Sequence, residues 1–216
     1  EYRAGRTPNP DIMCNQEIKF KLFLETALAD GAELIATGHY AKKVVVDGKS
    51  YLALATDQKK DQTYFLYRVT GEALDKTLLP LGELVKSDVR KLAETMGLIT
   101  ADKKDSQGIC FVGQVGIEEF LREYVEVSPG DIIEQETGRV LGRHKGAIFY
   151  TIGQRHGLEI GGGLPYFVVG KDMINNYVFV SRNLNQGGLW ARKIELRDCF
   201  WTHQVPVAGQ KYHVRL

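Results

Sequence analysis

Two segments of the sequence carry residues that could do chemistry, and the first runs from Thr7 to Asn15. It places an acid, Asp11, and a thiol, Cys14, three residues apart behind two prolines. Because closely spaced prolines restrict the backbone, we expect a stiff turn that is neither helix nor strand. Such a turn could present Asp11 as an acid or base and Cys14 as a nucleophile. A tight loop with a capping carboxylate and a packed thiol is the alternative, which the segment alone favours.

The second segment, from Lys103 to Phe111, places another thiol, Cys110, directly after a glycine and an isoleucine. Nearby lysines lower the pKa of a thiol and raise its thiolate fraction, which suits a sulfur carrier. A buried strand cysteine explains this segment equally well. The third cysteine, Cys199, lies in a run with strand composition, where a thiol is usually a small buried hydrophobe. We expect no chemistry from Cys199.

Composition narrows the class of protein. The 216 residues are 44% hydrophobic and 25% charged, as in ordinary globular proteins, and no apolar run reaches the roughly eighteen residues of a membrane span. Three widely spaced cysteines without a signal peptide argue against a disulfide framework and favour the cytoplasm. No Cys/His cluster has the spacing of a zinc site, so we expect no metal ligands.

Charge alone does not decide whether nucleic acid is a partner. The net charge is +1, but residues 139–156 hold three Arg, one Lys and two His without an acidic residue. On charge alone, a solvated face is the favoured interpretation of this basic run.

Hydrophobic periodicity predicts an α/β layer in the first half of the chain. A helix is expected over residues 19–30, and a short apolar run at 34–37 follows it and stops at Gly38-His39. The apolar positions of the helix are Phe20, Phe23, Leu24, Ala27 and Leu28. A helix followed by a buried strand is typical of a parallel sheet, and ligands bind at the carboxyl ends of its strands. Gly38 and His39 should therefore lie at a ligand-binding edge.

Further patterns predict a hairpin, a second helix and then a β-rich region. Strands at 44–46 and 51–55 flank a glycine turn, and Ser87 should cap a helix that ends at Met96. Beyond a polar break, a helix at 117–125 precedes strand pairs at 131–134 with 140–141 and 166–169 with 177–181. We expect domains at 1–102, 103–189 and 190–216, the last one opening another β domain.

Six segments occur in the order and spacing seen in one family, and together they cover residues 5 to 158. They are GRTPNPDIMCNQEIKF, IATGHYA, KDQTYFLYRV, LGELVKSDVRKLAETMGL, KKDSQGICFVG and YTIGQRHGL. The chain resembles the carboxy-terminal two-thirds of a tRNA-specific 2-thiouridylase. The most specific matches are the PNPDxxCN and GICF segments, whereas the fourth segment also fits a generic amphipathic helix.

The resemblance implies the remainder of a PP-loop ATP pyrophosphatase-type α/β domain, a small β-rich tRNA-binding domain and the start of a C-terminal β-barrel. It implies an enzyme that uses ATP, with Mg²⁺, to adenylate the C2 oxygen of the wobble uridine in tRNA and then replaces it with sulfur. Cys110 would carry a persulfide received from a sulfur-relay protein or cysteine desulfurase. Cys14 would attack the persulfide or form a disulfide with Cys110.

Other family roles follow motif by motif. Asp11 would be the acid or base, and Asn9 and Pro10 would line the pocket of the flipped uridine. Gly38 would approach ATP, since a residue without a side chain lets the backbone come close. The residues expected near the tRNA are His39, Lys60, Asp61 and Gln62. The basic run at 139–156 then becomes a candidate phosphate surface.

One part of the family pattern does not occur in these 216 residues, namely the phosphate-binding Ser-Gly-Gly-x-Asp-Ser loop. We therefore expect that this chain by itself does not adenylate RNA. A catalytically inert tRNA-binding fragment or paralogue is the alternative, although both cysteines are present. A thiol-disulfide oxidoreductase is less favoured, because such enzymes usually keep their cysteines in a CxxC pair.

Overall fold

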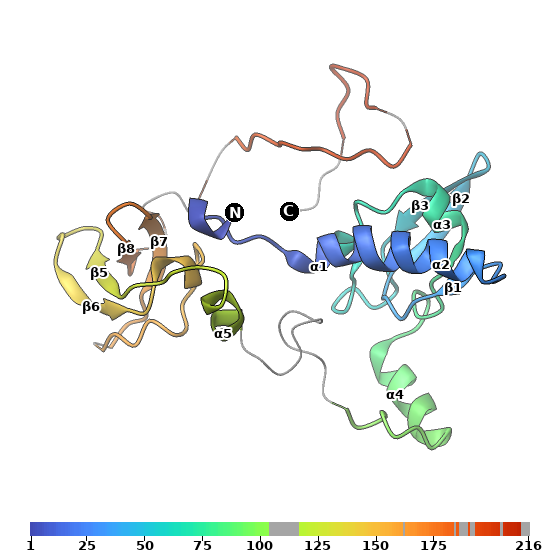
Figure 1. The fold of residues 1–216 in the computed structure, drawn as a ribbon, viewed down its shortest axis with the longest axis horizontal. Helices are drawn as coiled ribbons and strands as arrows, with labels where there is room; N and C mark the ends of the chain where they lie inside the picture. Colours follow the sequence, from blue (N-terminus) through green and yellow to red (C-terminus); the bar gives the residue numbers. More distant parts are fainter. Residues whose placement is uncertain are drawn as a thin grey trace. The chain divides into compact units, whose positions relative to one another are not determined.

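The computed structural model describes residues 1–103, 117–161, 163–183, 185, 190, 193–203 and 205–212. The chain divides into two compact units (Figure 1). The α/β unit consists of Pro10–Ser106 and Arg197–Leu216, and the β-rich unit consists of Glu1–Asn9 and Gln107–Leu196. An α/β part followed by a β-rich part agrees with the predicted fold class. No helix among the described residues is long and apolar enough to cross a membrane.

A single helical run begins at Pro10, so the prediction of a non-helical turn around Cys14 is wrong. It consists of α1 (Pro10–Met13), the π-helical segment η2 (Cys14–Phe23) and α2 (Leu24–Ala29), seen as one rod in Figure 1. Proline is well suited to a first helical position, because its φ is already helical and its missing N–H needs no partner there. Asp11 in the first turn adds a favourable charge at the positive end of the helix dipole.

The π-helical winding changes which side chains the helix buries. Asn15, Phe20 and Leu24 are buried, at spacings of five and four residues. A π-helix has i→i+5 hydrogen bonds and turns less per residue than an α-helix, so a five-residue spacing returns to the same face. Phe23, which α-helical spacing assigned to the core, is 55% exposed. That part of the prediction is wrong.

The core of the α/β unit lies between the helical run and a short parallel sheet. Strand β1 (Ile35–Ala36) pairs with β4 (Thr77–Leu78), which follows α3 (Gly71–Asp75). The buried cluster comprises Phe20, Leu24, Ile35, Ala41, Leu66, Val69, Ala73 and Leu74. The helix-then-strand prediction is confirmed, and the chain leaves β1 at its carboxyl end through Thr37 and Gly38.

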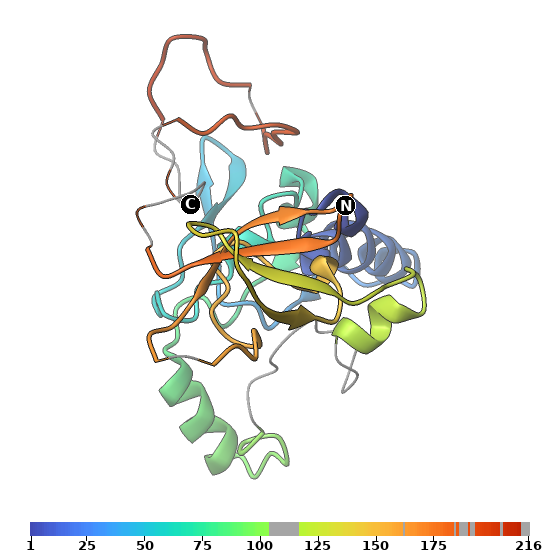
Figure 2. The same cartoon turned by 90° about the vertical axis from the view of Figure 1, so that its left-hand side faces the viewer.

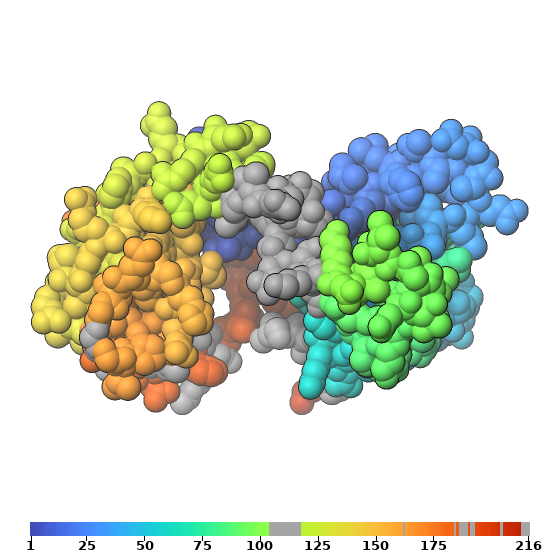
Figure 3. Space-filling model, turned by 90° about the horizontal axis from the view of Figure 1, so that it is seen from below, coloured from blue at the N-terminus to red at the C-terminus, as the bar shows by residue number. Residues whose placement is uncertain are grey.

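A hairpin and an outlying helix complete the described elements of 10–103, together with the 3₁₀ turn η3 (Thr63–Phe65). Strands β2 (Lys42–Val46) and β3 (Lys49–Ala53) pair antiparallel as predicted, with a two-residue turn in which Asp47 and Gly48 both have positive φ. Helix α4 (Lys86–Thr95), green in Figure 3, buries none of its residues. Val85, and not the predicted Ser87, occupies its N-cap position, without a side-chain cap.

The β-rich unit is built on a four-stranded sheet, which faces the viewer in Figure 2. After α5 (Ile117–Arg122) come β5 (Gly130–Glu134), β6 (Val140–His144), β7 (Phe167–Asp172) and β8 (Tyr177–Ser181). The order is β6-β5-β8-β7, with β5 and β8 parallel and the other pairs antiparallel. Both predicted strand pairs are therefore confirmed. The short turns η1 (Tyr2–Ala4) and η4 (Ala147–Phe149) also belong to this unit.

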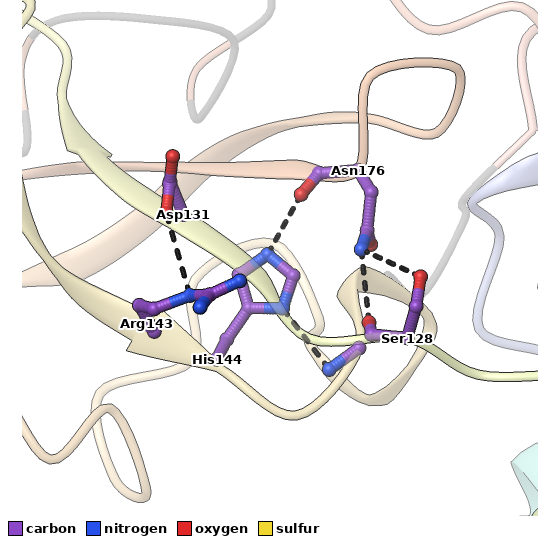
Figure 4. Close-up of polar contacts among 6 residues, drawn as sticks. Ser128, Asp131, Arg143, His144 and Asn176 are labelled. Atoms are coloured by element: carbon purple, nitrogen blue, oxygen red, sulfur yellow. Dashed lines mark hydrogen bonds and ion pairs between the residues drawn. The ribbon is translucent and has the colours of Figure 1, made fainter.

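A buried histidine joins three parts of this sheet (Figure 4). The Gly146 N–H donates to Nδ1 of His144 at 3.0 Å, so Nε2 carries the proton and donates to the Asn176 carbonyl at 3.0 Å. The Asn176 side chain donates to the Ser128 carbonyl and accepts from the Ala147 N–H. These bonds hold the β7–β8 turn against the start of β5 and the end of β6.

The segment after Leu196 belongs to the α/β unit, where His203 anchors it. The His203 ring lies 4.6 Å from the Tyr51 ring, and its Nε2 is 2.6 Å from the Ser50 carbonyl oxygen. A Cβ on Gly71 would collide with this ring. Within 193–203 and 205–212 there is no strand, and Cys199 is exposed, so both predictions for this region are wrong there. A strand needs a neighbouring strand as hydrogen-bond partner, and none of the described segments pairs with these residues.

Candidate functional site

The helical run carries both predicted reactive residues of the first motif. Asp11 lies in the first turn, and Cys14 is the first residue of η2, with its thiol free and its side chain half-buried. The two are three residues apart on a helix, which places them on neighbouring turns of the same side. Cys110 lies outside the described residues, so its pairing with Cys14 stays a prediction.

His39 is the residue that connects this helix to the strand edge. Its ring lies 5.7 Å from the Phe20 ring, and its Nδ1 is 3.0 Å from the Thr37 hydroxyl. Burial and, to a smaller extent, the positive charge of Lys19 lower the pKa of His39 to about 4, whereas the negative charge of Asp11 acts in the opposite direction. Asp11, Lys19 and His39 are therefore close enough for their charges to interact.

The lowered pKa decides what His39 can do near neutral pH. With a pKa of about 4, the imidazole is neutral and carries one donor and one acceptor nitrogen. A neutral ring can hydrogen-bond to a base, a sugar or a phosphate but adds no charge attraction. The structure therefore favours a hydrogen-bonding role over a phosphate-neutralising one.

Two further contacts tie the loop after β3 to the same region. Asn15, only 2% exposed, donates from Nδ2 to the Phe65 carbonyl at 3.0 Å. The Tyr40 N–H donates to the side-chain oxygen of Gln62 at 3.0 Å, and the Gln62 N–H donates to the Tyr40 carbonyl at 2.8 Å. Since Asn15 follows Cys14 and Tyr40 follows His39, these bonds fix the backbone beside both residues. Asn15 and Tyr40 thus hold the three predicted site segments together.

Lys60 and Asp61 differ in what they contact, although both are predicted to lie near tRNA. Asp61 is buried and its carboxylate accepts hydrogen bonds from the Ala55 N–H at 2.8 Å and from the Thr63 hydroxyl at 2.6 Å. A further bond comes from the Thr63 N–H. Asp61 therefore shapes its loop from inside, whereas Lys60 is exposed. Contact of either residue with tRNA stays a prediction.

Gly38 lies two residues beyond the end of β1 and is exposed. Its φ is not in the left-handed region, and a Cβ there would meet only Leu81, at 3.8 Å. Neither backbone conformation nor the packing of the described residues thus requires glycine. The described residues leave space beside the main chain at this position, and its approach to ATP stays a prediction.

Asn9 and Pro10 lie where the chain enters the helical run. Pro10 is its first residue, and Asn9, which is exposed, directly precedes it. Asparagine and proline are both favoured at such positions, so helix initiation already accounts for their types. The positions of Asn9 and Pro10 do not test their predicted contact with the target base, which stays a prediction.

The basic run at 139–156 divides into surface and core residues. Arg139, Arg143, Lys145 and Arg155 are exposed, and Arg143 lies 3.7 Å from Asp131. His144 is buried with both ring nitrogens bonded, as Figure 4 shows, so it cannot belong to a phosphate surface. Across the described part of the chain, no three His, Cys, Asp or Glu side chains are grouped to hold a metal ion.

Asn15 is the positioning residue that the sequence did not reveal. It stands within the first quoted motif, but α-helical spacing does not place it on the face of Phe20 and Leu24. Its burial follows from the π-helical winding of η2. The available signal was a polar amide directly after a candidate reactive cysteine, which is weak by itself.

Comparisons with known proteins agree with this architecture. Residues 1–114 match the family model described as the tRNA methyl transferase HUP domain, and residues 118–182 match the one described as the tRNA methyl transferase PRC-barrel domain. These matches define the class of fold, a HUP α/β domain followed by a PRC-barrel.

Three relatives bear the name tRNA-specific 2-thiouridylase MnmA. The Bacillus licheniformis protein is 50% identical over 212 residues, which are 98% of this chain and 57% of that protein. The Psychromonas ingrahamii protein is 49% identical (95% of this chain, 58% of that protein), and the Bacillus subtilis protein 48% (98% and 57%). The chain belongs to the tRNA-specific 2-thiouridylase family. It spans somewhat more than half the length of these relatives.

Proposed function

We propose that this chain provides the thiol chemistry and part of the tRNA surface of an enzyme that makes 2-thiouridine at the wobble position of tRNA. The observation that supports this most directly is the convergence of three segments in the α/β unit. The Asp11–Cys14 helix, the Gly38–His39 edge and the Lys60–Gln62 loop are joined by the ring contact of Phe20 with His39 and by the hydrogen bonds of Asn15 and Gln62. Acid, thiol and neutral imidazole are thus held on one support.

The proposed reaction replaces the C2 oxygen of the uridine by sulfur. Bound ATP, with Mg²⁺, would supply an adenylyl group that turns this oxygen into a leaving group. The terminal sulfur of a Cys110 persulfide would attack C2, and the Cys14 thiolate would attack the inner sulfur of Cys110, which releases the thiouridine. Cys14 and Cys110 end as a disulfide, and an external thiol must reduce it before the next turnover.

Each remaining residue has a role in this proposal. Asp11 would move a proton at the uridine ring, and Asn9 and Pro10 would border the flipped base. Gly38 would bring its backbone close to ATP, because the room at this position fits such an approach. His39 and Gln62 would hydrogen-bond to the RNA. The exposed residues Lys60, Arg139, Lys145 and Arg155 would neutralise phosphates.

Two features of the fold support the proposal that the parent protein is larger than this chain, and we propose that it acts in the cytoplasm. A two-residue pairing of β1 with β4 is a very small parallel sheet, and parallel sheets are normally larger and covered on both faces. Helix α4 also leaves Leu92 and Met96 exposed. We propose that the α/β unit is part of a PP-loop-type sheet.

A chimera tests this function. The matching region of the Bacillus subtilis relative is replaced by this chain, and 2-thiouridine is measured by mass spectrometry in tRNA from cells that lack their own enzyme. Cys14→Ser and Cys110→Ser should each abolish the product, whereas Cys199→Ser, which removes an exposed thiol, should not. Sulfur from a persulfide donor should appear on Cys110 even in the Cys14→Ser variant.

Two outcomes would contradict the proposal. If the chimera accumulates and binds tRNA but never forms 2-thiouridine, the chain is an inert tRNA-binding relative. If all three cysteine variants keep full activity, the thiol mechanism is wrong.

A further inference from the structure

Two tyrosines of the third family segment point outward although their neighbours form the core. Tyr64 is 49% exposed and Tyr67 is 43% exposed, whereas Leu66 and Val69 are almost fully buried. The phenol rings are therefore presented to solvent by backbone that is anchored from inside. Neither tyrosine has a role in the reaction proposed above.

The two rings line a common hollow. Tyr64 and Tyr67, three residues apart across η3, border a depression of about 340 Å³ together with Leu54 and Thr63. Leu54 is itself 51% exposed. A hollow with two aromatic rings, an apolar wall and a hydroxyl offers a flat ligand both stacking surface and a polar edge.

The support under these rings is rigid. Asp61 accepts hydrogen bonds from the N–H and the hydroxyl of Thr63, and the Phe65 carbonyl accepts one from the buried Asn15. The rings of Tyr64 and Phe65 lie 4.0 Å apart, and the guanidinium of Arg68 lies 6.0 Å from the centre of the Tyr67 ring. The hydrogen bonds fix the backbone that carries the two rings, so little main-chain freedom is lost when a ligand binds, which favours affinity.

The charges around the hollow indicate the kind of ligand. Lys59 and Lys60 precede the tyrosines in the sequence and are exposed, and Arg68 follows them. The only acid in this stretch, Asp61, is buried and hydrogen-bonded. Aromatic rings flanked by cations are the common composition of surfaces that stack unpaired bases and neutralise the neighbouring phosphates.

We propose that Tyr64 and Tyr67 form a stacking platform for an unpaired nucleobase of the RNA substrate. This inference rests on the proposed function, since it adds a second base contact on the same support as the Asp11–Cys14 helix. The platform would hold a base next to the target and so help keep the RNA loop open while the target base is flipped. The Lys60–Gln62 loop would then support the stacking rings in addition to presenting a charge.

Binding of RNA to the 216-residue chain tests the platform. The probes are a labelled anticodon stem-loop and a fully paired RNA duplex of equal length, measured by fluorescence anisotropy. Tyr64→Leu and Tyr67→Leu should each weaken stem-loop binding by about 5- to 150-fold, as expected for the loss of one stacked base, and leave duplex binding unchanged. Tyr64→Phe and Tyr67→Phe, which keep the ring, should bind like the parent chain.

Tyr124→Leu is the matched control, because Tyr124 is also exposed but lies in the β-rich unit. Equal stem-loop affinity of the Leu variants and the parent chain would overturn the platform and leave the proposed function standing. A lower unfolding temperature without a change in RNA affinity would also overturn it, because the tyrosines would then stabilise the fold and not bind RNA. If the parent chain binds no stem-loop RNA at all, the platform is wrong, whereas the proposed function is judged by the chimera.

Discussion

The two units each contain a histidine whose pKa is lowered by burial, but only one of these histidines keeps access to a ligand. His144 has both ring nitrogens bonded to backbone groups of its own unit. His39 contacts the Thr37 hydroxyl and the Phe20 ring and lies within the charge influence of Asp11. A lowered histidine pKa thus reports burial, whereas the hydrogen-bond partners of the ring decide whether the histidine supports the fold or can bind a ligand.

The hydrogen bonds of buried or turn asparagines differ between the two units in the same way. In the α/β unit the contacts join segments that carry candidate reactive residues, such as Asn15 beside Cys14. In the β-rich unit they join strands to one another, as Asn176 does with Ser128 and Ala147. Substitutions in the β-rich unit should therefore change mainly stability, whereas substitutions in the α/β unit should have the larger effect on RNA binding.

The largest effect is expected at Gly130, where β5 passes close to the His144 network. A Cβ there would collide with the Asn176 carbonyl oxygen, a backbone atom that cannot rotate away. Gly130→Ala should lower the free energy of unfolding of the β-rich unit by about 3 kcal/mol or more, measured by urea denaturation. Gly161→Ala is the control, because none of the described residues lies within 4 Å of its Cβ position and its φ is outside the left-handed region. Equal stability of the two variants would show that the close approach is not real.

Removal of the His144 ring itself should have the next largest effect. His144→Ala leaves the Gly146 N–H and the Asn176 carbonyl without their partner in a buried place, which should cost about 2–4 kcal/mol. His156→Ala removes an exposed histidine of the same unit and should change the unfolding free energy by less than about 0.5 kcal/mol. If His144→Ala changes the unfolding free energy no more than His156→Ala does, His144 does not support the fold and the contrast with His39 is wrong.

The pH dependence of stability should reveal the lowered pKa of His39. Its folded pKa of about 4 lies below the unfolded value of about 6.5, so the unfolded chain binds more protons between these values. Stability should be constant above about pH 7 and fall as the pH drops, by about 2 kcal/mol at pH 5 relative to pH 7.5. His39→Gln should reduce this loss, as seen in urea titrations at both pH values. The lowered pKa of His144 adds a loss of the same sign.

The smallest expected effect separates two neighbours that are both predicted to contact tRNA. Asp61→Asn replaces one accepting oxygen with a donor opposite the Ala55 N–H and should cost about 1–2 kcal/mol of stability. Lys60→Ala should leave stability within about 0.5 kcal/mol, weaken RNA binding and lower the slope of log affinity against log salt by about 1. If Lys60→Ala changes only stability, Lys60 is a structural residue and not a phosphate contact.

Local patterns predicted much of the fold. The glycine turn at Asp47-Gly48 predicted a hairpin, which the structure confirms, because only a few residues adopt the two left-handed positions of that turn. Both strand pairs of the β-rich unit were also found, since alternation with turn residues is a local signal. The start of the first helix was missed, because prolines at 8 and 10 were taken to exclude a helix that one of them begins.

The candidate site was only partly visible in the sequence. Spacing and residue types identified Asp11, Cys14, Gly38 and His39, and resemblance to the family assigned their roles. The structural roles of Asn15 and Asp61 depend on atoms of Phe65, Ala55 and Thr63 that the backbone brings to them. Hydrogen-bond partners at such positions are set by chain geometry, which residue types alone do not contain.

The sequence by itself therefore determined the family, the alternation of elements and the residues able to do chemistry, because these depend on residue type and short-range spacing. Only the tertiary structure decided which of them serve as support. It buried Asp61, Asn15 and His144, exposed Cys199, and left Tyr64 and Tyr67 at the surface. The physical reason is that burial and the partners of a polar group arise from packing between distant segments, and these set both the pKa of a side chain and its access to a ligand.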